Sequence, residues 1–353
     1  MSSIQGIEPS PNERKIIVLT PVRDEDWVLG KFLWAYSHFA DHILVLNQQS
    51  SDRSMEILGR FPKAVRVDYE ENAYNESARS RILVDEARKR FGSGCVLLAF
   101  DADEIPIWSC LSSPMWSQLK LLEPGTVICF EKPEILTNPL RCVRDPYRFP
   151  CGLVDDGRVH HGKLIHGERV PFSQNGKRFM ANELVIMHLA RVRWIEFCVR
   201  QSYYCAIENS RATKRYWWRT IYYSPRFFRK FGAGVSEDIP NSWWEGYRES
   251  GRDLWSFHTA RFNSFHLRVL RLFCEYGEPR FWRDDIWWED WEPARIFFIE
   301  QGVSKIPGSA IRRPPALARY FWSGCANLLV FYWAVRKLFK PANARSMRAQ
   351  FDL

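Results

Sequence analysis

Two aspartates at alternate positions, Asp101 and Asp103, follow directly on the apolar run Cys95 to Phe100. A short apolar run of this kind predicts a buried strand, and open α/β sheets bind their ligands where such strands end. Carboxylates spaced in this way can help to hold one hard divalent cation, which takes its remaining ligands from water and phosphate oxygens. The spacing therefore indicates a metal and nucleotide diphosphate site. A solvated acidic turn is the alternative that these residues alone leave open.

The elements that must position this acidic turn alternate between strand and helix. Strands are predicted at residues 15–21, 41–46, 64–68 and 95–100, with helices after Asp26, near Met55, and from Glu76 to Arg90. Alternating strands and helices predict a parallel sheet with helices on both faces. We therefore expect an α/β fold.

The order of four short segments resembles the family 2 glycosyltransferases of GT-A fold. These segments are Thr20 to Glu25, Asn47 to Ser54, Ala78 to Ser80, and Asp101 to Glu104. Further along, Ile165 to Pro171, Val185 to His188 and a tyrosine-containing helix at 200–204 are similar to a bacterial subgroup. The resemblance spans residues 15–209. It implies a Rossmann-like, mostly parallel central sheet with flanking helices, and transfer of a sugar from a nucleotide diphosphate sugar to an acceptor hydroxyl, usually with inversion.

The same resemblance assigns roles to individual residues. It places the following residues around the donor nucleotide: Thr20, Pro21, Arg23, Glu25, Gln48, Asp52, Arg79 and Asp101. A divalent metal, Mn²⁺ or Mg²⁺, would be held by Asp103 with help from Asp101 and His188. Guanidinium geometry suits phosphate oxygens, although Arg79 could instead be a surface arginine on a helix. His188 ends an apolar run that predicts a strand, so its imidazole could reach the metal or the diphosphate, or it could be a structural histidine. The same two interpretations apply to His166.

The catalytic base is harder to place, because the chain departs from the family pattern. Asn47 to Ser50 lacks the usual acidic residue and Gly-Ser pair, Arg53 replaces a glycine, and Ser80 replaces an asparagine. An inverting transfer needs a carboxylate that takes the proton of the acceptor hydroxyl. Glu168 and Asp156 are the preferred candidates because they flank the segment 160–171. The other available carboxylates are Glu131, Glu134, Asp145 and Asp155.

Composition adds expectations about organisation and location. The 353 residues carry a net charge of +9, which favours anionic partners. The sequence has nine cysteines but no CxxC pair, and its polar N-terminus has no apolar core. These features predict a cytoplasmic protein, either free or attached peripherally to the inner face of the plasma membrane. We expect a disordered segment at 1–14, a catalytic domain at 15–209, a helical region at 210–340 and a basic tail at 341–353.

The helical region is rich in arginine and aromatic residues, beginning with Arg211 to Lys230. Such residues could stack on nucleic-acid bases, anchor the protein at a membrane, or form a helical core with a basic surface. The uncharged segment 320–335 is shorter than the roughly 20 residues that span a bilayer. Its basic flanks suit a helix in the cytoplasmic leaflet, with a buried terminal helix as the equal alternative. These flanks are Arg312, Arg313 and Arg319 before it, and Arg336, Lys337 and Lys340 after it.

The sequence thus favours a glycosyltransferase acting on a glycan, lipid-linked or other hydroxyl acceptor, as in cell-surface polysaccharide or lipopolysaccharide synthesis. A nucleotidyltransferase is the alternative enzyme, although the loop from Thr20 to Asp26 lacks the glycine-rich, basic character expected of one. A nucleic-acid-binding protein and a catalytically silent GT-A scaffold are the alternatives from other classes, and nucleic acid is the less favoured partner.

Overall fold

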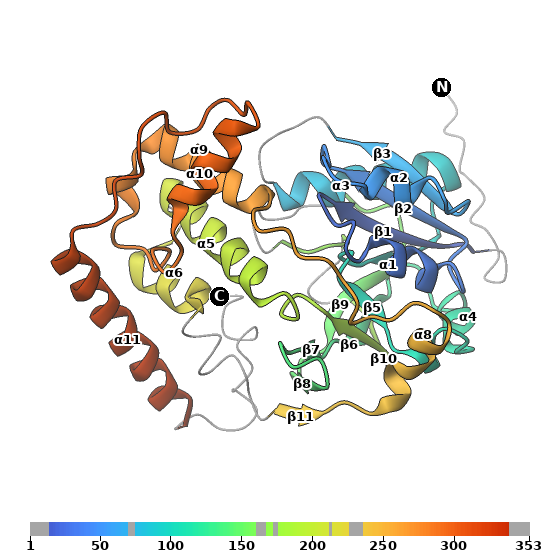
Figure 1. Cartoon of the computed structure of the whole chain (residues 1–353). Helices are drawn as coiled ribbons and strands as arrows, with labels where there is room; N and C mark the ends of the chain where they lie inside the picture. The colour runs from blue at the N-terminus through green and yellow to red at the C-terminus, as the bar shows by residue number, and fades with distance from the viewer. Residues whose placement is uncertain are drawn as a thin grey trace. The chain divides into compact units, whose positions relative to one another are not determined.

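The computed structural model describes residues 14–69, 75–159, 167–171, 176–211, 214–225 and 236–338. The chain divides into two compact units (Figure 1). The sheet unit consists of Met1–Leu189 and Glu237–His258, and the helical unit consists of Ala190–Ser236 and Thr259–Leu353. The predicted disordered segment 1–14, apart from its last residue, and the predicted basic tail 341–353 lie outside the described residues.

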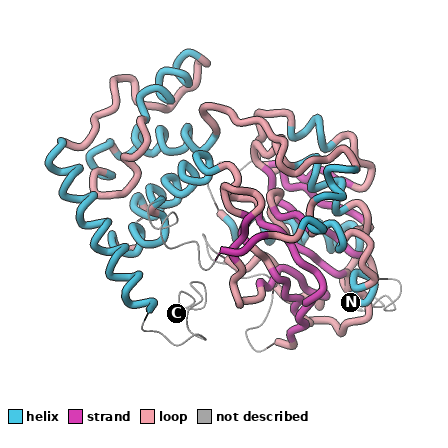
Figure 2. The backbone as a smooth tube through the Cα atoms, turned by 60° about the horizontal axis from the view of Figure 1, so that its bottom comes forward, coloured by secondary structure: helices cyan, strands magenta, loops and turns pink. Residues whose placement is uncertain are grey.

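The sheet unit is built on a mixed sheet with a mostly parallel centre, drawn in magenta in Figure 2. Strand β9 (Phe149–Val154) runs antiparallel between the parallel group β3-β2-β1-β4 and the parallel pair β6-β10. The group comprises β1 (Ile16–Val22), β2 (His42–Asn47), β3 (Ala64–Asp68) and β4 (Val96–Ala99), and the pair comprises β6 (Val127–Glu131) and β10 (Arg178–His188). Shorter strands are β5 (Glu104–Pro106), β7 (Glu134–Ile135), β8 (Arg141–Val143) and β11 (Ser236–Asp238). This arrangement confirms the predicted Rossmann-like α/β class.

Helices cover the sheet because its strands are apolar at successive positions. Leu97 and Ala99 belong to the core cluster that also contains Leu83 and Val84 of α3 (Glu76–Phe91). Phe100, at the alternating position, lies 5.3 Å from the ring of Tyr36 in α1 (Leu29–Tyr36). The shorter helices of the sheet unit are α2 (Ser54–Leu58), α4 (Met115–Leu119) and α8 (Glu245–Glu249), with 3-10 turns η2 (Trp108–Cys110) and η3 (Asn241–Trp243).

The two ends of helix α3 are fixed by an N-terminal capping residue and a C-terminal glycine. The Asn75 side chain accepts a hydrogen bond of 3.0 Å from the Ala78 N–H, which satisfies one of the backbone donors left over at a helix start. Gly92 ends the helix with a φ of 80°, a conformation that side-chain-bearing residues rarely adopt. Helix α3 therefore brings Glu76 and Arg79, in its first turn, to a fixed place beside the sheet.

The helical unit has an aromatic core. It contains α5 (Trp194–Ser210), α6 (Tyr216–Tyr223), α9 (Ser264–Tyr276), η4 (Glu278–Phe281), α10 (Trp291–Glu300) and α11 (Ala316–Leu338). Phe273 stacks on Trp287 at 5.4 Å, and Trp291 is fully buried beside them. The predicted helical, aromatic-rich region is confirmed, and these tryptophans form its core. Within the described part of the chain, no helix combines the length and apolar character needed to cross a bilayer.

The division between the units falls after Leu189, whereas the sequence predicted a boundary after Asn209. Helix α5 belongs to the helical unit because it packs against α6 and α9. In turn, residues 237–258 return to the sheet unit, where the Tyr247 hydroxyl donates a 2.7 Å hydrogen bond to the Pro106 carbonyl. Part of the aromatic sequence after residue 210 therefore completes the sheet unit.

Candidate active site

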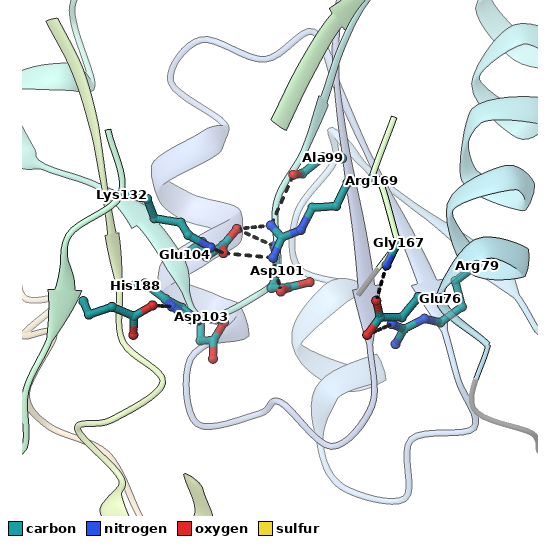
Figure 3. A network of polar contacts seen from close by, with 11 residues as sticks. Glu76, Arg79, Ala99, Asp101, Asp103, Glu104, Lys132, Gly167, Arg169 and His188 are labelled. Atoms are coloured by element: carbon teal, nitrogen blue, oxygen red, sulfur yellow. Dashed lines mark hydrogen bonds and ion pairs between the residues drawn. The ribbon is translucent and has the colours of Figure 1, made fainter. Parts of the chain in front are cut away.

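The acidic turn lies where β4 ends, at the sheet edge that also receives the ends of β1 and β2. Leu19 pairs with Ala99, and Val22 pairs with Asn47, so the loops that follow these three parallel strands leave the sheet at one edge. The turn is closed by the Asp101 N–H, which donates to the Glu104 carboxylate at 3.0 Å, and by the Glu104 N–H, which donates to the Asp101 carbonyl at 2.9 Å. Asp101 and Asp103 are thereby presented from one rigid turn (Figure 3).

Glu104 is fully buried between two permanent cations. Lys132 Nζ donates to Glu104 Oε1 at 2.5 Å, and both terminal nitrogens of Arg169 donate to the same carboxylate. Burial alone would raise the pKa of Glu104, but the charges of Arg169 and Lys132 hold that pKa well below its usual range. Arg169 also donates to Asp101 Oδ2 at 2.5 Å. Glu104 is therefore held ionised, and Asp101 is held in place by Arg169.

Asp103 faces a histidine that is itself oriented by a second carboxylate. His188 and Asp103 lie side by side in Figure 3, with His188 Nε2 3.6 Å from Asp103 Oδ1. His188 Nδ1 lies 2.6 Å from Glu134 Oε1. The pairing of β10 with β5 sets this geometry, since it aligns His188 with Glu104, and Leu189 N–H donates to the Asp103 carbonyl at 2.8 Å. Asp103 is nearly buried, with 4% of its side chain exposed. A carboxylate behind a histidine in this way is the usual outer-shell partner of a metal-ligating imidazole.

The donor set fits a cation that shares its coordination with phosphate. Among the described residues, no three His, Cys, Asp or Glu side chains converge closely enough to hold a metal ion by themselves. A Mg²⁺-like ion, however, is commonly held by one or two protein groups and completed by water and substrate phosphates. Asp103 and His188, whose Oδ1 and Nε2 atoms lie 3.6 Å apart, could serve as these protein groups.

The two loops predicted to surround the nucleotide bind each other. Asp24 accepts a 2.7 Å hydrogen bond from the Ser51 N–H, and the Glu25 N–H donates to Ser54 Oγ at 3.0 Å. The Asp26 N–H donates to Asp52 Oδ2 at 2.8 Å. Asp52 thus joins the loops, while the Glu25 carboxylate accepts the indole N–H of Trp27 at 2.7 Å. Both carboxylates help to fix the loop shape at the sheet edge.

The side chains of Gln48 and Arg79 are in contact. Arg79 Nη1 donates to Gln48 Oε1 at 3.0 Å, and its guanidinium lies 3.8 Å from the Glu76 carboxylate. Glu76 also accepts a 3.2 Å hydrogen bond from the Gly167 N–H (Figure 3). Helix α3 therefore links the loop after β2 to the segment 167–171, which carries Arg169. Arg79 is a constrained, half-buried group and not a freely solvated surface arginine.

The remaining predicted donor residues lie at the same edge. Thr20 and Pro21 are in the last part of β1, and Arg23 follows that strand. The Thr20 hydroxyl is buried and has no hydrogen-bond partner among the described residues. Glu168 is half-buried in the segment that places Arg169 against Asp101. His166 and Ile165 lie outside the described residues.

Asp156, the other predicted base, lies at the opposite end of the same strands. Val154 pairs with Val96, and the Asp155 N–H donates to the Cys95 carbonyl at 2.8 Å, so Asp156 follows the point where β4 begins. Its carboxylate is paired with Arg158, at 2.9 Å from the guanidinium Nε. The structure therefore does not bring Asp156 together with Asp101 and Asp103.

Sequence reasoning missed Lys132, Arg169 and the orienting role of Glu134. Lys132 follows an entirely buried strand, and a lysine at such a position signals a buried partner. Arg169 belongs to a segment that the sequence singled out, but only for its histidine and glutamate. The contacts of Lys132 and Glu134 could not be located without knowing that β5, β6 and β7 all pair with β10.

Comparison with known proteins gives little further guidance. No protein-family model and no curated protein matches this sequence. One similar solved structure is a 4-diphosphocytidyl-2C-methyl-D-erythritol synthase, at 16% identity and a TM-score of 0.28, over 33% of this chain and 59% of that chain, which is less than two thirds of its length. Another is HddC from Yersinia pseudotuberculosis, at 10% identity and a TM-score of 0.30, over 49% of this chain and 93% of that chain. At these TM-scores neither likeness identifies the reaction.

Proposed function

We propose that this protein is a metal-dependent glycosyltransferase that moves a sugar from a nucleotide diphosphate sugar to an acceptor hydroxyl. The observation that supports the proposal is the pair of contacts from Glu134 to His188 and from His188 to Asp103, at the edge of the sheet where β4 ends. It combines a nearly buried carboxylate with an oriented imidazole, beside a turn that carries a second carboxylate. Sugar transfer is proposed for this site because four sequence segments occur in the same order as in family 2 glycosyltransferases, which they resemble.

Asp103 and His188 are the residues that would hold the cation. Bound there, a Mn²⁺ or Mg²⁺ ion would supply positive charge to the diphosphate that departs from the sugar. Asp101 is already engaged by Arg169, so we assign it a supporting role in the charge of the site, or a contact with the donor ribose. Glu134 fixes the His188 ring so that Nε2 is directed toward Asp103.

The donor nucleotide would lie over the loops that follow β1 and β2. Gln48 and Arg79, joined at 3.0 Å, offer an amide and a guanidinium beside the first turn of α3. The buried Thr20 hydroxyl and the backbone from Pro21 to Glu25 offer further polar groups at this edge. Arg23 and Asp52 complete the set that we assign to the donor.

The acceptor oxygen would form a bond to the anomeric carbon as the bond from that carbon to the diphosphate breaks. The acceptor proton passes to a carboxylate, and the nucleoside diphosphate leaves. Glu168 is our candidate base, because it belongs to the segment that also delivers Arg169 to the site. We do not assign this role to Asp156, which lies at the other end of the strands.

The substitution Asp103→Asn tests the proposal. The amide keeps the size of the side chain but removes the charge, so release of nucleoside diphosphate from UDP-, GDP- or TDP-sugars should fall by roughly 10²- to 10³-fold. Asp156→Asn is the matched control and should retain activity, since its carboxylate lies at the other sheet edge. Equal activity of Asp103→Asn and wild type would overturn the metal assignment. Release of pyrophosphate from nucleoside triphosphates would instead favour a nucleotidyltransferase.

A further inference from the structure

No acidic residue lies between Glu300 and Asp352. The lysines and arginines of this stretch are Lys305, Arg312, Arg313, Arg319, Arg336, Lys337, Lys340, Arg345 and Arg348. The remainder of the chain contains both signs of charge in nearly equal numbers, so its excess of positive charge is concentrated here. A segment of this kind is attracted to an anionic surface rather than to another cationic one.

Helix α11 (Ala316–Leu338) occupies the middle of this cationic stretch and has one face packed within the helical unit. Ala326 and Val330 are almost fully buried. Trp322 lies 5.2 Å from the ring of Tyr216 in α6, the helix against which α11 packs (Figure 1). The helix is therefore anchored to the unit by one side.

The other face of α11 is apolar and exposed. Leu317 is 86% exposed and Leu328 is 70% exposed, and large side chains continue this face along the helix. The full set is Leu317, Tyr320, Phe321, Leu328, Phe331 and Tyr332. Their spacing of three, one, seven, three and one residues places all of them on one side of an α-helix. No charged residue interrupts the sequence from Tyr320 to Val335.

We infer that this face of α11 docks on an anionic lipid bilayer. A helix with one broad apolar face lies in the plane of the membrane interface, where leucine, phenylalanine and tyrosine side chains enter the boundary between headgroups and acyl chains. Arg319 lies near the start of the apolar face and Arg336 follows it, so both ends offer a cation to lipid phosphates. Arg312 and Arg313, further toward the N-terminus, are ion-paired with Glu278 and Asp290. The opposite side of α11, which carries Trp322, Ala326 and Val330, is packed within the helical unit and not turned to water.

A second copy of the chain is the competing occupant of this face. Two copies of α11 placed face to face would bring together two stretches that are both cationic and both without acidic residues, which is electrostatically unfavourable. An anionic bilayer satisfies both the apolar face and the flanking charges. The docking of α11 is independent of the proposed function, since it uses none of the residues of the candidate active site.

The test is co-sedimentation of the full chain with vesicles of phosphatidylcholine alone or of phosphatidylcholine mixed with phosphatidylglycerol. The wild-type chain should bind the mixed vesicles far more tightly than the neutral ones. The combined substitution Phe321→Ser, Leu328→Ser and Phe331→Ser should abolish binding, and because these side chains are exposed the melting temperature should change little. The control, Ile296→Ser, Phe297→Ser and Ile299→Ser on α10, removes three apolar side chains of the same unit that are 38–44% exposed, and it should bind as wild type does.

The charged flank is tested separately. Arg319→Gln should weaken binding to the mixed vesicles by roughly fivefold, and added salt should also weaken it. Equal binding to neutral and mixed vesicles, or no binding to either, would overturn the inference. So would a dimer in light scattering that the α11 serine variant converts to a monomer, because the second copy would then be the occupant.

Discussion

The two units both bury carboxylates beside arginine, with opposite effects on their pKa. In the sheet unit, Glu104 lies between Arg169 and Lys132, and these charges lower its pKa in spite of burial. In the helical unit, burial raises the pKa of Asp284, even though Arg219 donates to it at 2.9 and 3.2 Å. One guanidinium does not offset the loss of water around Asp284, whereas two cations do so for Glu104.

This difference distinguishes a buried carboxylate whose ionised form is favoured from one whose ionised form is disfavoured. Burying ions is costly, and replacing them with apolar groups is often neutral or stabilising. His266 follows the pattern of the helical unit, since burial lowers its pKa to about 4. A concentration of buried, ionised groups is therefore expected where function requires charge. In the described part of the sheet unit, Glu104 and its partners lie directly behind Asp101 and Asp103.

Removal of Lys132 should have the largest effect on stability. Lys132→Met leaves Glu104 with Arg169 alone, so the free energy of unfolding at pH 7 should fall by about 3–5 kcal/mol. The folded-state pKa of Glu104 is depressed, so its contribution is present above the unfolded pKa and is lost as the pH falls through the folded pKa. The difference between variant and wild type should therefore shrink in acid. Urea unfolding of the wild type and of Lys132→Met at pH 7 and pH 4 measures the loss of stability and its decrease in acid.

Lys89→Met is the control for this substitution, because Lys89 is 77% exposed in its pair with Glu86. Its effect should stay within the few tenths of a kcal/mol typical of surface pairs. If the two lysine variants lost equal stability, the contrast between the buried cluster and an ordinary surface pair would disappear.

His266 should make the helical unit sensitive to acid. It is buried, and its Nδ1 accepts the Asn263 N–H at 3.2 Å at the start of α9. Because its folded pKa is lowered to about 4, the neutral form contributes stability above the unfolded pKa, and this is lost as the pH falls toward 4. The loss amounts to about 3 kcal/mol by pH 4. His266→Gln keeps an acceptor without a titratable group, so its melting temperature should depend less on pH over this range.

Removing the Glu134 carboxylate should lower the affinity for the metal ion and leave the stability of the fold nearly unchanged. Glu134→Gln weakens the orientation of His188, and loss of such a partner typically lowers metal affinity by about 10- to 100-fold. The Mn²⁺ concentration that gives half-maximal activity should rise accordingly, while the melting temperature without metal changes little. Glu123→Gln, in an exposed pair with Lys177, should leave the Mn²⁺ requirement unchanged. A lower melting temperature with an unchanged Mn²⁺ requirement would make Glu134 a purely structural group.

The sequence predicted the fold well where the signals were local. The strand predicted at 64–68 is β3, the helix predicted at 76–90 is α3, and the acidic turn follows β4. Periodicity and turn chemistry act over a few residues, so these elements could be identified without the structure. The sequence also placed His188 at the end of a strand, and the structure brings it to 3.6 Å from Asp103. The roles of both residues stay predictions.

The parts that could not be predicted depend on contacts between distant segments. Lys132 reaches Glu104 only because β6 and β5 both pair with β10. The boundary at Leu189 follows from the packing of α5 on α9, which is set by tertiary structure and not by composition. Asp156 is close in sequence to the segment 160–171, which the family resemblance places near the acceptor. Because β9 runs antiparallel to β4, Asp156 instead lies at the edge of the sheet where β4 begins.

The most direct test of the account is the melting temperature of the wild-type chain and of Asp103→Asn with UDP, GDP, CMP, TDP or ADP, each with Mn²⁺ or with a chelator. A ligand that binds only the folded state raises its melting temperature. We predict that one nucleoside diphosphate with Mn²⁺ stabilises the wild type, and that both the chelator and Asp103→Asn remove this stabilisation. No stabilisation by any nucleotide, or the same stabilisation in chelator and in Asp103→Asn, would contradict a metal-dependent donor site at Asp103.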